Sequence, residues 1–189
     1  MPLVASIIHL ATSAINGLMS STDKAKLDAI KTLHVFSATD NHPPASSYAT
    51  LDTRNSHPVL DFDAAADESA IFAAVLSRTY TGLGLTVILH WTATSATSGT
   101  CRWAVSFERC NTDIDADSFA TANTAGTTTN GTSGIINTTS INFANGAEMD
   151  SLAVGERFRL KVMRDADGTS GTDDMAGDAE LLAVEIREQ

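Results

Sequence analysis

Three aspartates at alternate positions are the feature of this sequence that most directly suggests chemistry: Asp113, Asp115 and Asp117. Carboxylates at this spacing can surround a hard cation in a loop, as they do in helix-loop-helix calcium sites. The rest of that pattern is missing, because Ser118 stands where glycine is required and Thr124 where a bidentate glutamate is required. Aspartates that satisfy turn amides are the preferred interpretation; Ca2+ is the alternative, and no other cofactor is expected.

Other side chains that could do chemistry form no recognisable grouping. The five histidines lack metal-ligand spacing, and the sequence contains neither a nucleophile signature nor a phosphate-binding glycine loop. Trp91, Trp103 and Tyr80 could stack on a sugar ring, but alternation places both tryptophans on an inward face. Core packing is therefore preferred for them, and we expect no catalytic residues and no enzymatic activity.

The charge balance narrows the range of partners. The chain has 23 acidic and 12 basic residues, a formal net charge of −11. This disfavours nucleic-acid binding, which needs a basic patch, and attraction to an anionic membrane surface. No stretch approaches the roughly 20 apolar residues of a membrane span. No basic region precedes the mildly apolar N-terminus, so a secretion signal is not expected.

The two cysteines, Cys101 and Cys110, are expected at opposite ends of one strand. At ~3.4 Å per residue, those ends lie about 30 Å apart, which is beyond the reach of a disulfide. We therefore predict two free thiols, with Cys101 in the core. Free thiols are typical of a protein made in a reducing cytoplasm.

Alternation of apolar and polar residues dominates the second half of the chain. It is clearest in residues 85–94, 101–108, 157–162 and 182–187, and weaker strands are expected at 58–63, 69–78 and 135–144. Residues 125–134 are expected to form a loop or a hairpin tip, and residues 149–155 a helical turn. Period-two alternation indicates strands with one buried face, hence antiparallel sheets. The prediction is an all-β protein with an antiparallel, jelly-roll-like β-sandwich.

Three regions follow from these patterns. Residues 1–35 are expected to be an anchoring and trimerisation segment with a short helix, since Ser20 and Asp23 have capping-box spacing. Residues 36–57 are expected to be an extended linker, because they are polar and contain consecutive prolines. Residues 58–189 are expected to form the sandwich knob.

Part of the first region resembles a known building element. Residues 17–30 have the sequence GLMSSTDKAKLDAI, which resembles the GLMS-x-x-DK-x-KLD-x-I element of bacteriophage tail-fibre and other virion-fibre proteins. Residues 115–120, 130–135 and 175–188 also resemble a domain of phage structural proteins. The resemblance implies a virion component that forms a homotrimer, with oligomerisation contacts from Leu18, Met19, Leu27 and Ile30.

The expected function is therefore that of a viral structural protein: a trimeric fibre, spike or capsid-decoration protein. It would be synthesised in the host cytoplasm, exposed on the virion surface, and attached to capsid or tail proteins through the N-terminal segment. The alternative is an adhesin at a tail-fibre tip that binds a host-surface glycan, which requires exposed aromatic rings and converging polar side chains. A depolymerase would require paired carboxylates in a cleft.

Overall fold

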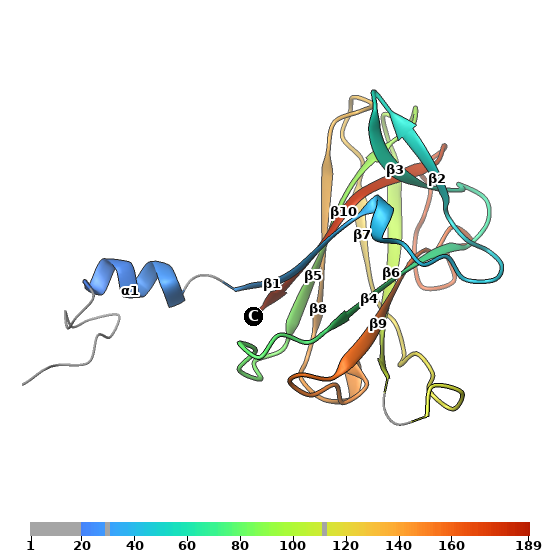
Figure 1. Cartoon of the computed structure of the whole chain (residues 1–189). Helices are drawn as coiled ribbons and strands as arrows, with labels where there is room; N and C mark the ends of the chain where they lie inside the picture. Colours follow the sequence, from blue (N-terminus) through green and yellow to red (C-terminus); the bar gives the residue numbers. More distant parts are fainter. Residues whose placement is uncertain (1–19, 29–30, 111–112) are drawn as a thin grey trace, which may run out of the picture. The chain divides into compact units, whose positions relative to one another are not determined.

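The computed structural model describes residues 20–28, 31–110 and 113–189 (Figure 1). The chain divides into two compact units, Met1–Lys31 and Thr32–Gln189. In the first unit, helix α1 (Ser21–Asp28) is preceded by Ser20, whose hydroxyl accepts the Asp23 N–H at 3.1 Å. This is the expected N-terminal capping contact. The predicted oligomerisation residues Leu18, Met19 and Ile30 lie outside the described residues, as does the side chain of Leu27.

The second unit is an antiparallel β-sandwich, which confirms the predicted fold class. One sheet, sheet A, contains β1 (Thr32–Ser37), β2 (Thr50–Arg54), β3 (His57–Phe62), β5 (Leu85–Ala93), β8 (Asn137–Phe143) and β10 (Ala179–Glu188). The other, sheet B, contains β4 (Glu68–Val75), β6 (Thr100–Cys110), β7 (Asn123–Thr128) and β9 (Arg157–Arg164) in the order β4-β9-β6-β7. Short 3-10 turns, η1 (Ala38–Asp40) and η2 (Ala147–Met149), complete the unit. Within the described residues, no helix is long and apolar enough to cross a membrane.

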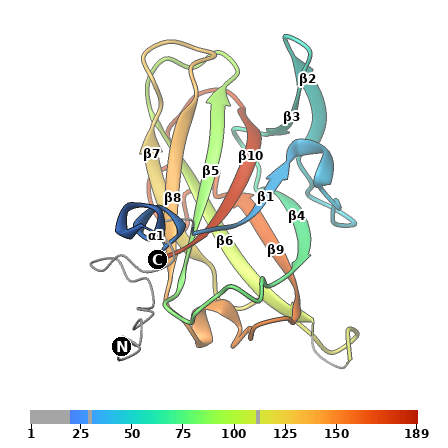
Figure 2. The same cartoon turned by 60° about the vertical axis from the view of Figure 1, so that its left-hand side comes forward.

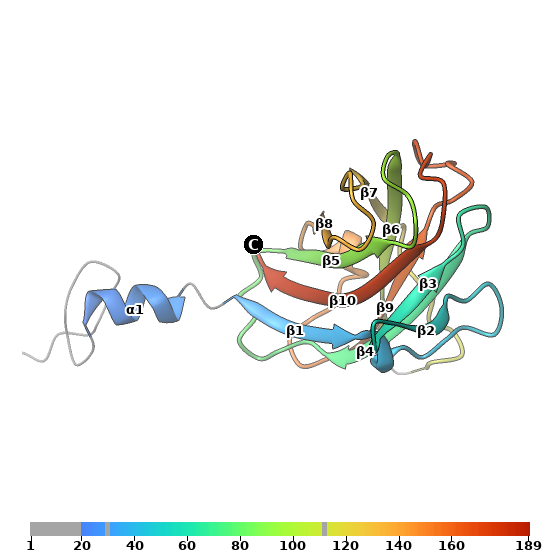
Figure 3. The ribbon, with the colours of Figure 1, turned by 90° about the horizontal axis from the view of Figure 1, so that it is seen from above.

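Strand β10 is the central element of sheet A. Along its whole length it pairs with β5, and on its other edge it pairs first with β3 and then with β1. Figure 2 shows β1, β10, β5 and β8 side by side, and Figure 3 shows β1 and β3 following each other along the same edge of β10. The β2–β3 hairpin is thus attached to the sandwich mainly through β3.

The core lies between the two sheets and is filled by the residues that alternation assigned to the inner faces. Trp91 on β5 and Trp103 on β6 are fully buried, with ring centroids 6.0 Å apart. The Trp91 indole N–H donates to the Thr139 hydroxyl at 2.9 Å, so this buried polar group is satisfied. Core packing, the preferred role of both tryptophans, is confirmed.

The extended linker predicted for residues 36–57 is wrong, because the structure places β2, η1 and the end of β1 there. Phe36 is buried and stacks on Phe72 of sheet B, and Asn41 Oδ1 accepts the Ile71 N–H at 2.9 Å. The polar side chains of this region thus bond to the sandwich backbone as well as facing solvent, and the sandwich begins at Thr32. The predicted loop at 125–134 is also partly a strand, since β7 extends to Thr128.

Candidate functional site

A groove of about 530 Å³ lies on the outer face of sheet A, beside the β2–β3 hairpin. Residues from β2, β3, β5, β10 and the β7–β8 connection line it: Arg54, Asn55, His57, Val59, Thr92, Gly134, Ile136 and Leu182. Pockets that hold drug-sized ligands commonly measure about 300–1,000 Å³, so the groove has room for a ligand of that size.

Arg54 fixes one wall of this groove. Its Nη1 donates to the Ala93 carbonyl at 2.8 Å and to Glu180 Oε2 at 2.5 Å, and its Nη2 donates to the Ser133 hydroxyl at 3.0 Å. Gly134 fits beneath the guanidinium, since a Cβ there would lie 3.2 Å from Arg54 Nη2. These contacts join the hairpin to β5, β10 and the β7–β8 connection, and they hold this wall of the groove in place.

The groove combines an apolar floor with polar groups at the hairpin end. Val59 is buried in the floor, whereas Ile136 is exposed at the rim. His57 is exposed near the hairpin turn, while the Thr92 hydroxyl is already used, because it donates to the Ile135 carbonyl at 3.0 Å. Such a surface suits an amphipathic ligand.

A second hollow, which we call the Tyr48 hollow, is also bordered by the hairpin. It measures about 210 Å³ and is lined by Ala38, Thr39, Asn41, Pro43, Tyr48, Ala49, Thr50, Leu51 and Leu60. Leu60 is fully buried, whereas Tyr48 is 49% exposed and Leu51 is 57% exposed. The hollow therefore combines a buried apolar residue with a half-exposed aromatic side chain.

The backbone around Tyr48 is held on sheet B. Tyr48 forms an isolated parallel bridge with Ser69, the Ala49 N–H donates to the Ser69 carbonyl at 3.1 Å, and the Ser69 N–H donates to the Ser47 carbonyl at 2.9 Å. Sequence reasoning missed Tyr48 because it sits in an irregular polar segment without alternation. A tyrosine isolated among serines and alanines was the available signal.

The aromatic side chains that the sequence offered for sugar stacking are not on the surface. Trp91 and Trp103 are fully buried, and Tyr80 is 6% exposed. The Tyr80 hydroxyl accepts the Gly84 N–H and donates to Asn145 Oδ1, both at 3.1 Å. Tyr80 therefore fixes two loops at one end of the sandwich.

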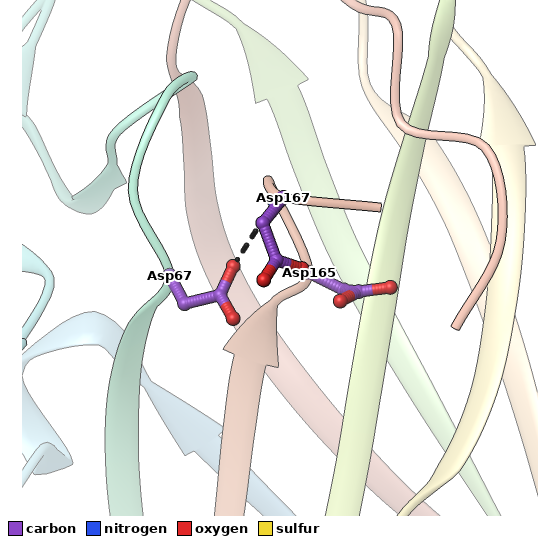
Figure 4. Close-up of side chains that lie close together, drawn as sticks. All are labelled: Asp67, Asp165 and Asp167. Carbon is purple, nitrogen blue, oxygen red and sulfur yellow. Dashed lines mark hydrogen bonds between the residues drawn. The ribbon is translucent and has the colours of Figure 1, made fainter. Parts of the chain in front are cut away.

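Three carboxylates converge where β4 begins and β9 ends. Oxygen atoms of Asp67, Asp165 and Asp167 lie within 4.8 Å of one another (Figure 4). Asp67 Oδ1 accepts the Asp167 N–H at 3.2 Å. Asp165 is buried and accepts hydrogen bonds from the Thr169 hydroxyl and the Ser170 N–H, both at 3.0 Å. Three oxygen donors of this kind suit a hard cation, although several of them already bond to the loop itself.

The hydrogen bonds at Asp165 also set its charge state. Burial by itself would raise the pKa of Asp165, but donation from Ser170 and Thr169 outweighs burial and holds the pKa below its usual value. Asp165 is therefore ionised at neutral pH and stabilises the loop that follows β9.

Asp113, Asp115 and Asp117, which the sequence offered as the alternative calcium site, are not among the described carboxylates that converge. Asp113 Oδ1 accepts the Asp115 N–H at 3.1 Å, which is the turn-stabilising role given preference in the sequence. Among the described residues, the carboxylates that do converge are Asp67, Asp165 and Asp167. Asp67 is distant in sequence, so no spacing rule could have joined it to the other two.

Two more carboxylates, Asp61 and Glu180, face each other as register partners on β3 and β10. Burial, together with the negative charges of Asp178, Glu180, Asp52 and Glu68, raises the pKa of Asp61 to about 6. Glu180 instead pairs with Arg54. Neither residue is among those that line the groove.

No protein-family model matches the chain, and the search of curated proteins finds no match. Solved structures show a similar chain course. The K3 cleaved adhesin domain of Lys-gingipain from Porphyromonas gingivalis is 13% identical, with a TM-score of 0.42 over 82% of this chain and 90% of that chain. The CBM22-2 xylan-binding domain of Xyn10C from Paenibacillus barcinonensis is 12% identical, with a TM-score of 0.45 over 79% of this chain and 92% of that chain. We transfer no function from these similarities.

Proposed function

We propose that the protein is a structural component of a virus particle: a trimeric fibre, spike or capsid-decoration protein whose sandwich is an exposed head. The observation that carries the proposal is the division of the chain at Lys31, next to a fibre-like sequence. The sandwich from Thr32 onward has its own continuous core. The first 31 residues therefore serve as a separate attachment and trimerisation segment, and the head acts by binding.

Physical chemistry supports an assembly role for the first unit. Helix α1 has eight residues, and helices shorter than about 12–15 residues are marginally stable alone in water. Three copies can bury Leu18, Met19, Leu27 and Ile30 around a common axis, as in other helical bundles. A closed trimer also presents three heads together, so weak contacts to a repetitive surface add up through avidity.

Incorporation into particles tests this proposal. Host cells producing the virus would also produce a tagged copy of the full chain, a tagged copy lacking residues 1–31, or a tagged Leu27→Asp, Ile30→Asp variant. The full chain is expected on purified particles, and the other two are expected in the soluble fraction. Thr22→Ala, at an exposed position of α1, is the matched control and should be incorporated normally. Incorporation of the truncated chain at the full-length level would refute the attachment role.

A tail-fibre-tip adhesin for a host-surface glycan is the second candidate. Two surfaces favour the adhesin: the Tyr48 hollow and the groove on sheet A that Arg54 borders. Both are open and place polar side chains near apolar ones. Electron microscopy of labelled particles separates the two. Label around capsomers supports decoration, whereas label at the tail tip supports the adhesin.

A further inference from the structure

We propose that the Tyr48 hollow binds one neutral sugar ring, which stacks on the Tyr48 side chain. This inference rests on the adhesin form of the proposed function and assigns its ligand class and binding residues. Among the described phenylalanine, tryptophan and tyrosine residues, Tyr48 is the most exposed, at 49%. An aromatic ring offers its face to the apolar C–H side of a pyranose, and its hydroxyl can bond to the sugar or to water.

The size of the hollow fits a single ring. Its volume of about 210 Å³ is below the range of about 300–1,000 Å³ that is common for drug-sized ligands. The larger groove at Arg54 lies beside the same hairpin, where Val59 contributes to the groove and the adjacent Leu60 to the hollow.

The lining decides the charge of the ligand. Among the described residues that line the hollow, none carries a charged side chain, although the chain as a whole has a net charge of −11. An acidic sugar would find no counter-charge there and would be repelled by the surrounding protein. A basic ligand would lose hydration without gaining a carboxylate partner.

Polar groups for the ring hydroxyls are already oriented. The Ile71 N–H donates to Asn41 Oδ1 at 2.9 Å, which fixes the amide of Asn41 with its Nδ2 group as a donor. The backbone on both sides of the hollow is held by β4, through the His42 N–H to the Ile71 carbonyl at 2.7 Å and the bridge at Tyr48. Thr50 on β2 is an exposed residue whose side chain carries a hydroxyl. A hollow built this way loses little conformational entropy when a sugar binds.

Saturation-transfer NMR on the full-length protein tests the site. The neutral probes are methyl glycosides of glucose, galactose and mannose; the charged probes are glucuronic acid and glucosamine. We expect at least one neutral glycoside to bind, with saturation strongest on one face of its ring, and both charged sugars to bind more weakly. Tyr48→Ala should weaken binding by about tenfold or more, which corresponds to about 1.4 kcal/mol. Tyr48→Phe, which keeps the ring, should retain most of it.

Ile114→Ala is the control, because Ile114 is exposed in a turn that does not line the hollow. Thermal melting verifies that each variant is folded. The inference would be overturned if Tyr48→Ala bound the sugar as well as the wild type, or if no neutral probe bound. A polyproline peptide is a further probe, and it would overturn the inference if it bound and no sugar did. Particles are still expected to incorporate Tyr48→Ala at the normal level, since attachment belongs to residues 1–31. Loss of that incorporation would count against the attachment role. The NMR measurements with the sugars test the Tyr48 hollow as a binding site.

Discussion

Inside the sandwich, Arg164 Nη2 donates to Asp173 Oδ1 at 2.8 Å, and both side chains are at most 1% exposed. Arg164 Nε donates to the other carboxylate oxygen at 3.1 Å, and the remaining N–H groups reach the carbonyls of Phe62, Met175 and Gly177. All five guanidinium donors are therefore satisfied. The pair fastens the connection between β9 and β10 to the end of β9.

Breaking this pair is expected to be costly. Arg164→Met keeps the length of the side chain but leaves Asp173 buried without its counter-charge, so we expect a loss of about 3–5 kcal/mol in the free energy of unfolding. Urea denaturation measures it. Arg187→Met is the matched control, because Arg187 is 47% exposed and its pairing with Glu185 spans 3.5 Å; its loss should stay below about 1 kcal/mol. Equal losses would show that burial of the first pair does not matter.

The two faces of β6 should respond differently to truncation. Trp103 is fully buried between the sheets and packs against Phe62 with ring centroids 5.0 Å apart. Trp103→Ala should cost about 3–5 kcal/mol, because it leaves a large cavity. Arg102→Ala, on the outer face, should cost less, although Arg102 Nη2 donates to the Thr124 hydroxyl at 2.9 Å. Chemical denaturation of both variants checks the order, and the reverse order would invert the assignment of faces.

Asp61 should make stability depend on pH. Its pKa is about 6 in the folded protein and about 3.9 in an unfolded chain, so the folded state binds the proton more tightly. The contribution of Asp61 to the free energy of unfolding should therefore rise as the pH falls from above 6 towards 4.

Asp61→Asn removes this dependence. The variant should melt at a higher temperature than the wild type at pH 8, and the difference should shrink as the pH approaches 4. Asp115→Asn, in an exposed turn, serves as the control for loss of one charge. An Asp61→Asn protein that is less stable than the wild type at pH 8 would contradict the prediction.

The two thiols should differ in reactivity. Both cysteines are free, but Cys101 is buried and Cys110 is partly exposed, beside Arg157 Nη1 at 3.3 Å from its sulfur. Burial raises the pKa of the Cys101 thiol, which further suppresses its thiolate. Titration with a thiol reagent should label Cys110 in the native protein and both cysteines after denaturation. Fast native labelling of Cys101 would mean that β6 is not held in the core.

Oligomeric state should depend on the N-terminal unit. The full chain is expected to scatter light as a particle of about three times its 19.8 kDa mass. A chain of residues 32–189 should be a folded monomer, because its core is complete without the first 31 residues. Circular dichroism confirms the folding of the shorter chain. A full-length monomer at micromolar concentration would exclude the trimer.

Much of the sandwich could be predicted because burial imposes a period of two on half-buried strands. The alternating faces of β5, β6 and β9 were assigned correctly from this period. In β10, a register shift between Leu181 and Ala183 places Leu181 in the core and leaves Leu182 lining the outer groove, so the expected inward position of Leu182 is wrong. The sequence of β1 and β2 carries no such signal. β1 pairs with only part of β10. β2 is an edge strand, and most of its residues are exposed. Without strong burial on one face, these strands resemble a polar linker.

The candidate sites were harder to predict, since each depends on contacts between distant segments. Tyr48 is exposed because the β2–β3 hairpin leaves a hollow beside it, and Asp67 meets Asp165 only after β4 and β9 have paired. Residue spacing along the chain reports neither event. The exposed aromatic residue Tyr48 was therefore not identified from the sequence. The aspartates that were weighed as the alternative calcium site are not the ones that converge.

The position of β10 has a consequence for how the protein is made. This strand, Ala179–Glu188, follows every other strand of the sandwich in the sequence, yet it supplies pairing partners to β1, β3 and β5. A ribosome releases the chain from its N-terminus at roughly 5–20 residues per second. The first 31 residues, the proposed attachment segment, therefore emerge well before sheet A can close. If they associate as proposed, nascent chains on neighbouring ribosomes can meet through them while their sandwiches are still incomplete.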